Sequence, residues 1–118
     1  MRTLKTFDQV YLCREPVDFR RSLDGLVAIV VSEFKADPYK PALFAFTNRY
    51  RDRVRLLYWD RTGFALWYKR LEEHHFPWPR DPNVKSIVLT PKELGLILDG
   101  IDIARARPHP TLSYTASL

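Results

Sequence analysis

Two neighbouring segments of alternating side chains constrain the fold of this chain most strongly. Residues 53–59 and 64–71 each alternate with a period of two, which is typical of β-strands with one buried face. The intervening Asp60–Gly63 (DRTG) has aspartate at the start and glycine at the end of a hairpin loop. A third apolar segment, residues 42–47, precedes them across a short polar turn. Residues 42–71 therefore predict an antiparallel meander with one face buried on a helix and the other facing solvent.

A long amphipathic helix is predicted over residues 22–35. Either Asp18 or Ser22 can accept the unpaired backbone N–H groups at its start. The prolines at 38 and 41 indicate where the segment ends. Its apolar side chains recur three and four residues apart, the spacing of one helix face; they are Leu23, Leu26, Val27, Val30, Val31 and Phe34.

A second, shorter helix is predicted over residues 91–99. Thr90 and Glu93 have the spacing of a capping box, and a proline occupies the first helical position between them. We expect this helix to close an edge of the sheet, which strands near 7–14 and 86–90 extend. The predicted fold class is α+β, an antiparallel β-meander packed against one long amphipathic helix, with a second short C-terminal helix.

Length and composition are typical of one globular domain. The chain has 118 residues, of which 46% are hydrophobic, enough for a single core. We expect the domain to span residues 1–103 and residues 104–118, which lack periodicity, to be a flexible tail. The longest apolar run, Leu26–Val31, is far shorter than the roughly 20 residues of a membrane span. With a single cysteine and no secretory signal pattern at the start, we expect a cytoplasmic protein without membrane association.

The positive charge is concentrated in the middle of the chain. Residues 49–71 hold seven basic and two acidic residues, a net charge of +5 that equals the formal net charge of the whole protein. Arginine predominates, and its guanidinium group binds phosphate in a forked geometry. The alternative is a solvated face that balances its own charge. The candidate nucleic-acid-binding residues are Arg49, Arg51, Arg53, Arg55, Arg61, Lys69 and Arg70.

Three tryptophans are candidate interaction residues: Trp59, Trp67 and Trp78. Trp59 shares a strand face with Arg53 and Arg55, and Trp67 shares one with Lys69. Such pairs suit phosphate contacts combined with base stacking, or insertion of the hairpin into a DNA groove. The alternative places Trp59 and Trp67 in the core, with the arginines at its rim.

Two further sequence features leave questions open. Arg20 and Arg21 either line the same charged surface or pair with Asp18 and Asp24 near the start of the long helix. The proline-rich segment 72–85 is predicted to be a loop held in place by Phe76 and Trp78.

No pattern of catalytic or metal-binding residues is apparent. The adjacent residues of Glu72–His75 (EEHH) would point apart on an extended chain, whereas metal ligands converge. Cys13 lies in a predicted strand, and the histidines lie in predicted loops or the tail, so no nucleophile is paired with a base. We therefore predict no catalytic residue, no metal site and no cofactor, and a small basic nuclease is the weakest hypothesis.

Three segments resemble a known family: Pro16–Leu26 (PVDFRRSLDGL), Leu43–Leu71 and Phe76–Pro79 (FPWP). They are similar to the TnpB accessory proteins. These are encoded by the second open reading frame of the bacterial insertion sequences that form the insertion sequence 66 family. The resemblance covers roughly positions 8 to 103, and Arg61 departs from it, since the family more often has a small residue there. It implies a role in transposition beside a separate DDE transposase, and it transfers no catalytic residue.

Two functional hypotheses follow from the charge and the resemblance. The first is a non-catalytic DNA-binding accessory protein that contacts phosphates through the arginine-rich hairpin. It predicts that affinity falls steeply with salt and falls in an Arg53→Ala/Arg55→Ala variant. The second is a protein–protein adaptor that recruits or stabilises the transposase of the same element through its tryptophans and tail.

Overall fold

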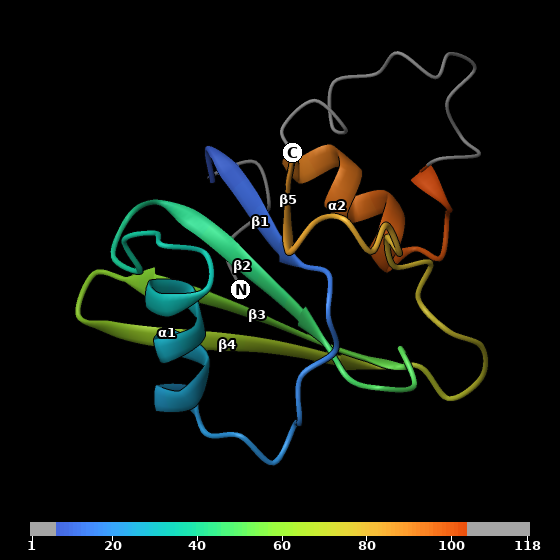
Figure 1. The fold of residues 1–118 in the computed structure, drawn as a ribbon, viewed down its shortest axis with the longest axis horizontal. Helices are drawn as coiled ribbons and strands as arrows, with labels where there is room; N and C mark the ends of the chain where they lie inside the picture. The colour runs from blue at the N-terminus through green and yellow to red at the C-terminus, as the bar shows by residue number, and fades with distance from the viewer. Residues whose placement is uncertain (1–6, 104–118) are drawn as a thin grey trace.

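The structure, a computed structural model, describes residues 7–103 as a mixed five-stranded sheet with one helix on each face (Figure 1). The strand order is β4-β3-β2-β1-β5. Strands β2, β3 and β4 are antiparallel neighbours, so the predicted meander is confirmed. The predicted tail, residues 104–118, lies outside the described residues. The strands are β1 (Gln9–Cys13), β2 (Ala42–Thr47), β3 (Arg53–Asp60), β4 (Gly63–Arg70) and β5 (Ser86–Leu89).

One strand pair departs from the antiparallel prediction. β1 and β2 are parallel, and the helix α1 (Leu23–Ser32) connects them. A parallel pair needs such a crossover, because the chain must return to the starting end of the sheet. β1 thereby lies between β2 and the antiparallel β5, so the sheet is mixed.

The helix α1 is ten residues long, and the prediction of a long helix over 22–35 is wrong. Its start is as predicted, because the Ser22 side chain accepts a hydrogen bond from the Gly25 N–H. At the other end, Lys35 has a φ of 51°, in the left-handed region, which cannot continue the helix. Phe34 remains in the apolar cluster beneath α1, so the apolar spacing continues beyond the helix itself.

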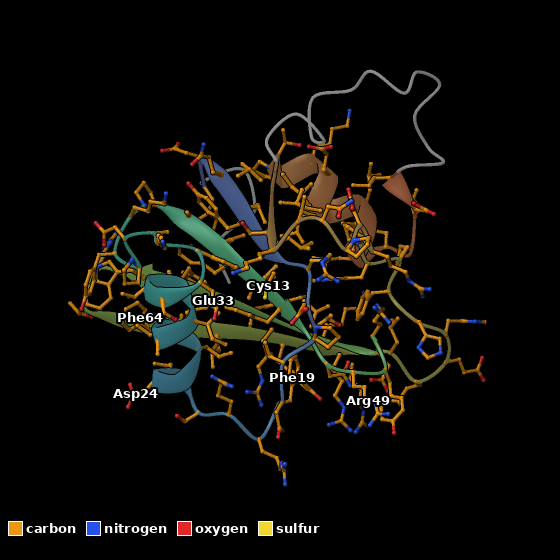
Figure 2. All side chains as sticks on the ribbon, viewed as in Figure 1. Cys13, Phe19, Asp24, Glu33, Arg49 and Phe64 are labelled. Carbon is orange, nitrogen blue, oxygen red and sulfur yellow. The ribbon has the colours of Figure 1, made fainter. Side chains whose placement is uncertain are left out.

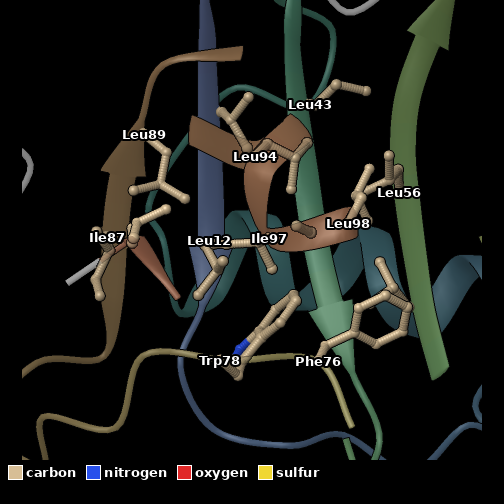
Figure 3. Close-up of a cluster of buried hydrophobic side chains, with 14 of the residues drawn as sticks. Leu12, Leu43, Leu56, Phe76, Trp78, Ile87, Leu89, Leu94, Ile97 and Leu98 are labelled. Carbon is tan, nitrogen blue, oxygen red and sulfur yellow. The ribbon is translucent and has the colours of Figure 1, made fainter. Parts of the chain in front are cut away.

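The second helix, α2 (Pro91–Leu98), covers a face of the sheet rather than an edge. Leu94 and Ile97 belong to the same apolar cluster as Leu12, Leu43 and Leu56 from the central strands (Figure 3). Each face of the sheet therefore packs against a helix, and the expectation of a solvent-facing second face is wrong. The strands permit this because most of their residues on that face are apolar as well.

The loop after β4 completes this second core. Phe76 and Trp78 are 1% and 3% exposed, which confirms that they hold the loop in place. The Trp78 indole Nε1–H donates a 2.8 Å hydrogen bond to the Cys13 carbonyl. The buried indole is thus satisfied, and the loop is fixed to the end of β1.

Candidate nucleic-acid interface

The structure separates the seven candidate basic residues into three places. Arg61 lies in the loop that joins β3 and β4; β3 has eight residues, so this loop is about 25 Å from Arg53. Lys69 faces α2, where its Nζ donates a 3.1 Å hydrogen bond to the Leu98 carbonyl. The other five lie in or near the β2–β3 turn: Arg49, Arg51, Arg53, Arg55 and Arg70.

The strand register explains the separation. Residues directly opposite each other share a sheet face, and Arg53 pairs with Arg70 whereas Val54 pairs with Lys69. Arg53 and Arg55 therefore lie on the face that carries α1, and Lys69 lies on the face that carries α2. The basic hairpin predicted from the sequence is charged on two opposite sides.

The three tryptophans are separated in the same way. Trp78 is buried, and Trp67 is partly buried against the same α2-side core, so these two side chains do not form an exposed patch. Trp59 lies on the α1 side, partly buried between Tyr39 and Phe64, at ring-centroid distances of 4.9 and 5.0 Å. As a candidate interaction residue, Trp78 is not available at the surface, because the proline-rich loop folds back onto the sheet.

A groove of about 650 Å³ runs between the β1–α1 connection and the α1 side of the hairpin. We refer to it as the basic groove. Aromatic side chains, among them Phe19 and Tyr68, line it as well, and Phe19 and Arg49 lie at this end of the molecule (Figure 2). A second hollow of about 460 Å³, which includes Arg21, shares several of these lining residues. The basic side chains of the groove are Arg20, Arg49, Arg53 and Arg55.

The β2–β3 turn holds one side of the groove in a fixed shape. The Asn48 side-chain oxygen accepts hydrogen bonds from the backbone N–H groups of Asp52 and Arg53, at 3.1 and 3.0 Å. Its side-chain nitrogen donates to the Asp52 carboxylate at 2.6 Å. Because Asn48 holds this carboxylate, the acidic residue of the turn forms no ion pair with its neighbouring arginines within residues 7–103.

Charge compensation in the groove is incomplete. Arg20 pairs with Asp18 at 2.7 Å, and this guanidinium holds the pKa of the Asp18 carboxyl at about 2. Arg49, Arg53 and Arg55 form no ion pair with a carboxylate in the part of the chain that the structure describes. The Nε of Arg53 is buried and has no hydrogen-bond partner there. The groove therefore presents cationic groups that an anionic ligand could bind.

Arg55 is held in place by its own molecule. Its guanidinium carbon lies 4.6 Å from the centre of the Phe19 ring. Its Nη1 donates a 3.1 Å hydrogen bond to the Arg21 carbonyl. Because a guanidinium has five N–H donors, this arrangement orients Arg55 and leaves donors available to a ligand.

The structure resolves the question about Arg20 and Arg21. Arg20 does both things considered from the sequence, since it pairs with Asp18 and also lines the groove. Arg21 lies over Gly25, where a Cβ atom would come within 2.3 Å of the Arg21 Cγ. In the sequence, the only signal for these two residues is that they form a double arginine just before the helix cap. Their position beside the hairpin results from the path of the chain between the parallel strands β1 and β2, which sequence reasoning did not predict.

Residues 7–103 meet neither the requirements of a metal site nor those of a membrane-spanning helix. No group of three or more histidine, cysteine, aspartate or glutamate side chains is arranged there to hold a metal ion. None of the helices described has the length and apolarity needed to cross a membrane.

Comparison with known proteins identifies the family. The model of the family described as "IS66 Orf2 like protein" matches residues 8–108, which include every strand and helix of the fold. The chain belongs to the IS66 Orf2-like family. This confirms the resemblance seen in the sequence, and it associates the chain with transposition in an accessory family that is not known to be catalytic.

Two relatives come from Sinorhizobium fredii (strain NBRC 101917 / NGR234). The "Uncharacterized protein y4jC" is 37% identical over 102 residues, covering 86% of each chain. The "Uncharacterized protein y4hO" is 29% identical over 94 residues, covering 80% of this chain and 81% of its own. No solved structure matches.

Proposed function

We propose that this protein is a non-catalytic accessory factor in transposition that binds DNA through the basic groove. The observation that carries the proposal is the set of three arginines without carboxylate partners among the described residues, Arg49, Arg53 and Arg55, on one side of a groove. Transposition acts on DNA, so a DNA ligand suits the family.

The groove chemistry suits a phosphate backbone with unstacked or flanking bases. Guanidinium groups bind phosphate oxygens in a forked geometry, and Phe19, Tyr50 and Tyr68 add aromatic surface beside them. Phosphate contacts fix the position of a protein on DNA without reading its sequence. We therefore expect the groove to hold DNA with little sequence preference of its own.

The test is a DNA-binding titration by fluorescence anisotropy at several salt concentrations. The probes are a duplex carrying an insertion-sequence end and a random duplex of equal length. Each neutralised phosphate contributes about −0.9 to the slope of log K against log salt. An Arg49→Ala/Arg53→Ala variant removes two contacts, so its slope should be less steep by about 1.8.

Arg61→Asn is the matched control, because it removes one positive charge at the far end of the hairpin. Asparagine tolerates the left-handed backbone of that position, where φ is 56°. Arg61→Asn should leave the slope nearly unchanged. Undetectable binding at low salt, or equal slopes for the double variant and the wild type, would contradict the proposal.

A transposase adaptor is the second candidate, and one observation favours it. Tyr39, half-buried Trp59 and Phe64 form an aromatic cluster on the α1 side, and Tyr39 is 58% exposed. Exposed aromatic clusters are typical of interface hot spots. The adaptor hypothesis predicts co-purification with the transposase that survives nuclease and high salt and is lost in Tyr39→Ala.

A further inference from the structure

Three arginines outside the basic groove come together at one end of the sheet. Arg14 follows β1, and Arg51 lies in the turn that follows β2. Because β1 and β2 are parallel, both positions are at the same end of the strands. Arg80 belongs to the loop that is fixed there by Trp78. We refer to Arg14, Arg51 and Arg80 as the arginine triad.

Hydrogen bonds between the three segments hold the triad together. The Arg14 side-chain Nε donates to the Val84 carbonyl at 2.6 Å, so it is tied to the loop that carries Arg80. The Phe76 N–H donates to the Arg51 carbonyl at 2.7 Å, which ties the turn to the same loop. These contacts bring together the three segments that carry the triad, although the segments are far apart in the sequence.

The charge of the triad is poorly compensated. Burial, followed by the positive charges of Arg80 and Arg14, lowers the pKa of Arg51. The Nε of Arg51 is buried and has no hydrogen-bond partner among the described residues. The carboxylate that pairs with the triad, Glu15, binds Arg14 at 3.1 Å and is itself 73% exposed. Within residues 7–103, Arg51 forms no ion pair with a carboxylate, and its buried donor has no acceptor.

We propose that Arg14, Arg51 and Arg80 bind a phosphate group at a site separate from the basic groove. A tetrahedral phosphate has oxygens pointing in several directions, so guanidinium groups from three segments can each donate to it. A planar carboxylate is satisfied by a single guanidinium fork. Arginines from three segments, one of which has a buried donor without a partner, therefore suit phosphate better than a carboxylate.

The phosphate can come from solution or from a DNA backbone, since both present the same oxygens. The β2–β3 turn connects the two sites, because Arg49 and Arg53 line the groove while Arg51, between them, belongs to the triad. The phosphate site does not depend on the groove, and its test does not require that the groove binds DNA.

The experiment follows the Arg51 Nε–Hε signal by NMR of the full chain, assigned by its loss in Arg51→Gln. Inorganic phosphate is titrated first, and a DNA duplex is titrated separately. We expect a saturable shift with phosphate. Arg80→Ala should weaken binding about tenfold or more, as expected for one charge-assisted contact. Arg80 is exposed, so this variant should fold, and Arg61→Asn should bind phosphate as the wild type does.

Each outcome separates this proposal from DNA binding by the groove. A saturable shift with phosphate supports the triad even if no duplex binds. A shift with the duplex alone supports it, and assigns the site to a backbone phosphodiester, if Arg80→Ala abolishes the shift and the groove variant Arg49→Ala/Arg53→Ala retains it; the reverse result overturns it. The proposal is overturned if neither probe gives a saturable shift, or if Arg80→Ala weakens binding no more than Arg61→Asn does.

Discussion

The two faces of the β2–β3–β4 meander are built from the same strands but have different character. On the α2 side, Val54 and Leu56 are fully buried, and Trp67 packs against their cluster. On the α1 side, Leu57 is equally buried, but Leu66 and Tyr68 are 37% and 48% exposed. One face is therefore a closed core, and the other is only partly covered.

The short length of α1 explains this difference. A helix of ten residues is about 15 Å long, and α1 lies over the part of its face nearer the β3–β4 loop (Figure 1). The part nearer the β2–β3 turn is left to the β1–α1 connection, and the basic groove lies there. The candidate binding surface therefore lies beyond the N-terminal end of α1, where the helix no longer covers the sheet.

The largest expected effect is on the closed face. Trp78→Ala should lower the free energy of unfolding by about 3–5 kcal/mol, because it leaves a cavity and an unpaired Cys13 carbonyl. Urea unfolding followed by circular dichroism measures it. Tyr50→Ala is the matched control, since Tyr50 is 67% exposed and its truncation should change stability little. A loss below about 1 kcal/mol in Trp78→Ala would mean that this face is not a closed core.

The second prediction concerns the covered part of the α1 side. Burial raises the pKa of the Cys13 thiol from 9.0 to about 11, with the carboxylates of Glu15 and Glu33 adding to the rise. At pH 8.5 the thiolate fraction should be roughly a hundredfold lower in the folded than in the unfolded chain. Iodoacetamide alkylation with and without urea measures this, and rates within about threefold of each other would contradict it.

The same pKa shift determines how the free energy of unfolding changes with pH. Well below pH 9 the thiol is neutral in both states, so the stabilising contribution is fully present. As the pH rises from 9.0 towards about 11, the unfolded thiol ionises first, and the folded state loses this contribution. Cys13→Ser should be compared over the same range, because its hydroxyl does not ionise there.

A smaller effect distinguishes two basic residues on opposite faces of β4. Lys69 donates to the Leu98 carbonyl, and α2 has no basic residue in its own last turn. Lys69→Met should therefore cost about 0.5–1.5 kcal/mol of stability and leave DNA affinity nearly unchanged. Arg70→Met, on the other face, breaks only an exposed ion pair with Glu72 and should cost less. The opposite ranking in urea unfolding would contradict the assignment of Lys69 to α2.

Features that depend on nearby residues could be predicted from the sequence. The capping box is one, since the Thr90 hydroxyl accepts from the Glu93 N–H at 3.1 Å and the Glu93 carboxylate accepts from the Thr90 N–H at 3.0 Å. The hairpin is another, because its register follows from its short loop. The parallel β1–β2 pair and the place of α2 could not be predicted, because they depend on distant contacts such as that between Cys13 and Trp78.

The candidate site was only partly accessible to sequence reasoning for the same reason. Arg53 and Arg55 share a face because they are two residues apart in one strand, which the alternation predicts. That Arg20 lies across the groove from them follows from the path of the β1–α1 connection. Arg14 and Arg80 are isolated in the sequence, and only the tertiary structure brings them near Arg51.

The smallest expected effect concerns Gly25 on α1, which leaves room for the Arg21 side chain beside the basic groove. A Cβ at Gly25 would lie 2.3 Å from the Arg21 Cγ, so Gly25→Ala must displace the Arg21 side chain. Alanine favours a helix over glycine by up to about 1 kcal/mol, but displacing the Arg21 side chain offsets part of this gain, so the free energy of unfolding should change by less than about 1 kcal/mol. DNA affinity should nevertheless decrease roughly two- to fivefold, the range of one exposed ionic contact.

The control for Gly25→Ala is the same substitution in an Arg21→Ala background. If the loss of affinity comes from moving the Arg21 guanidinium, the glycine substitution should have no effect on DNA binding once that side chain is absent. An equal loss in both backgrounds would instead attribute it to α1 itself. If the effect disappears in the Arg21→Ala background, the glycine at position 25 serves to leave room for a cationic side chain beside the groove, at the cost of the helix propensity that alanine would provide.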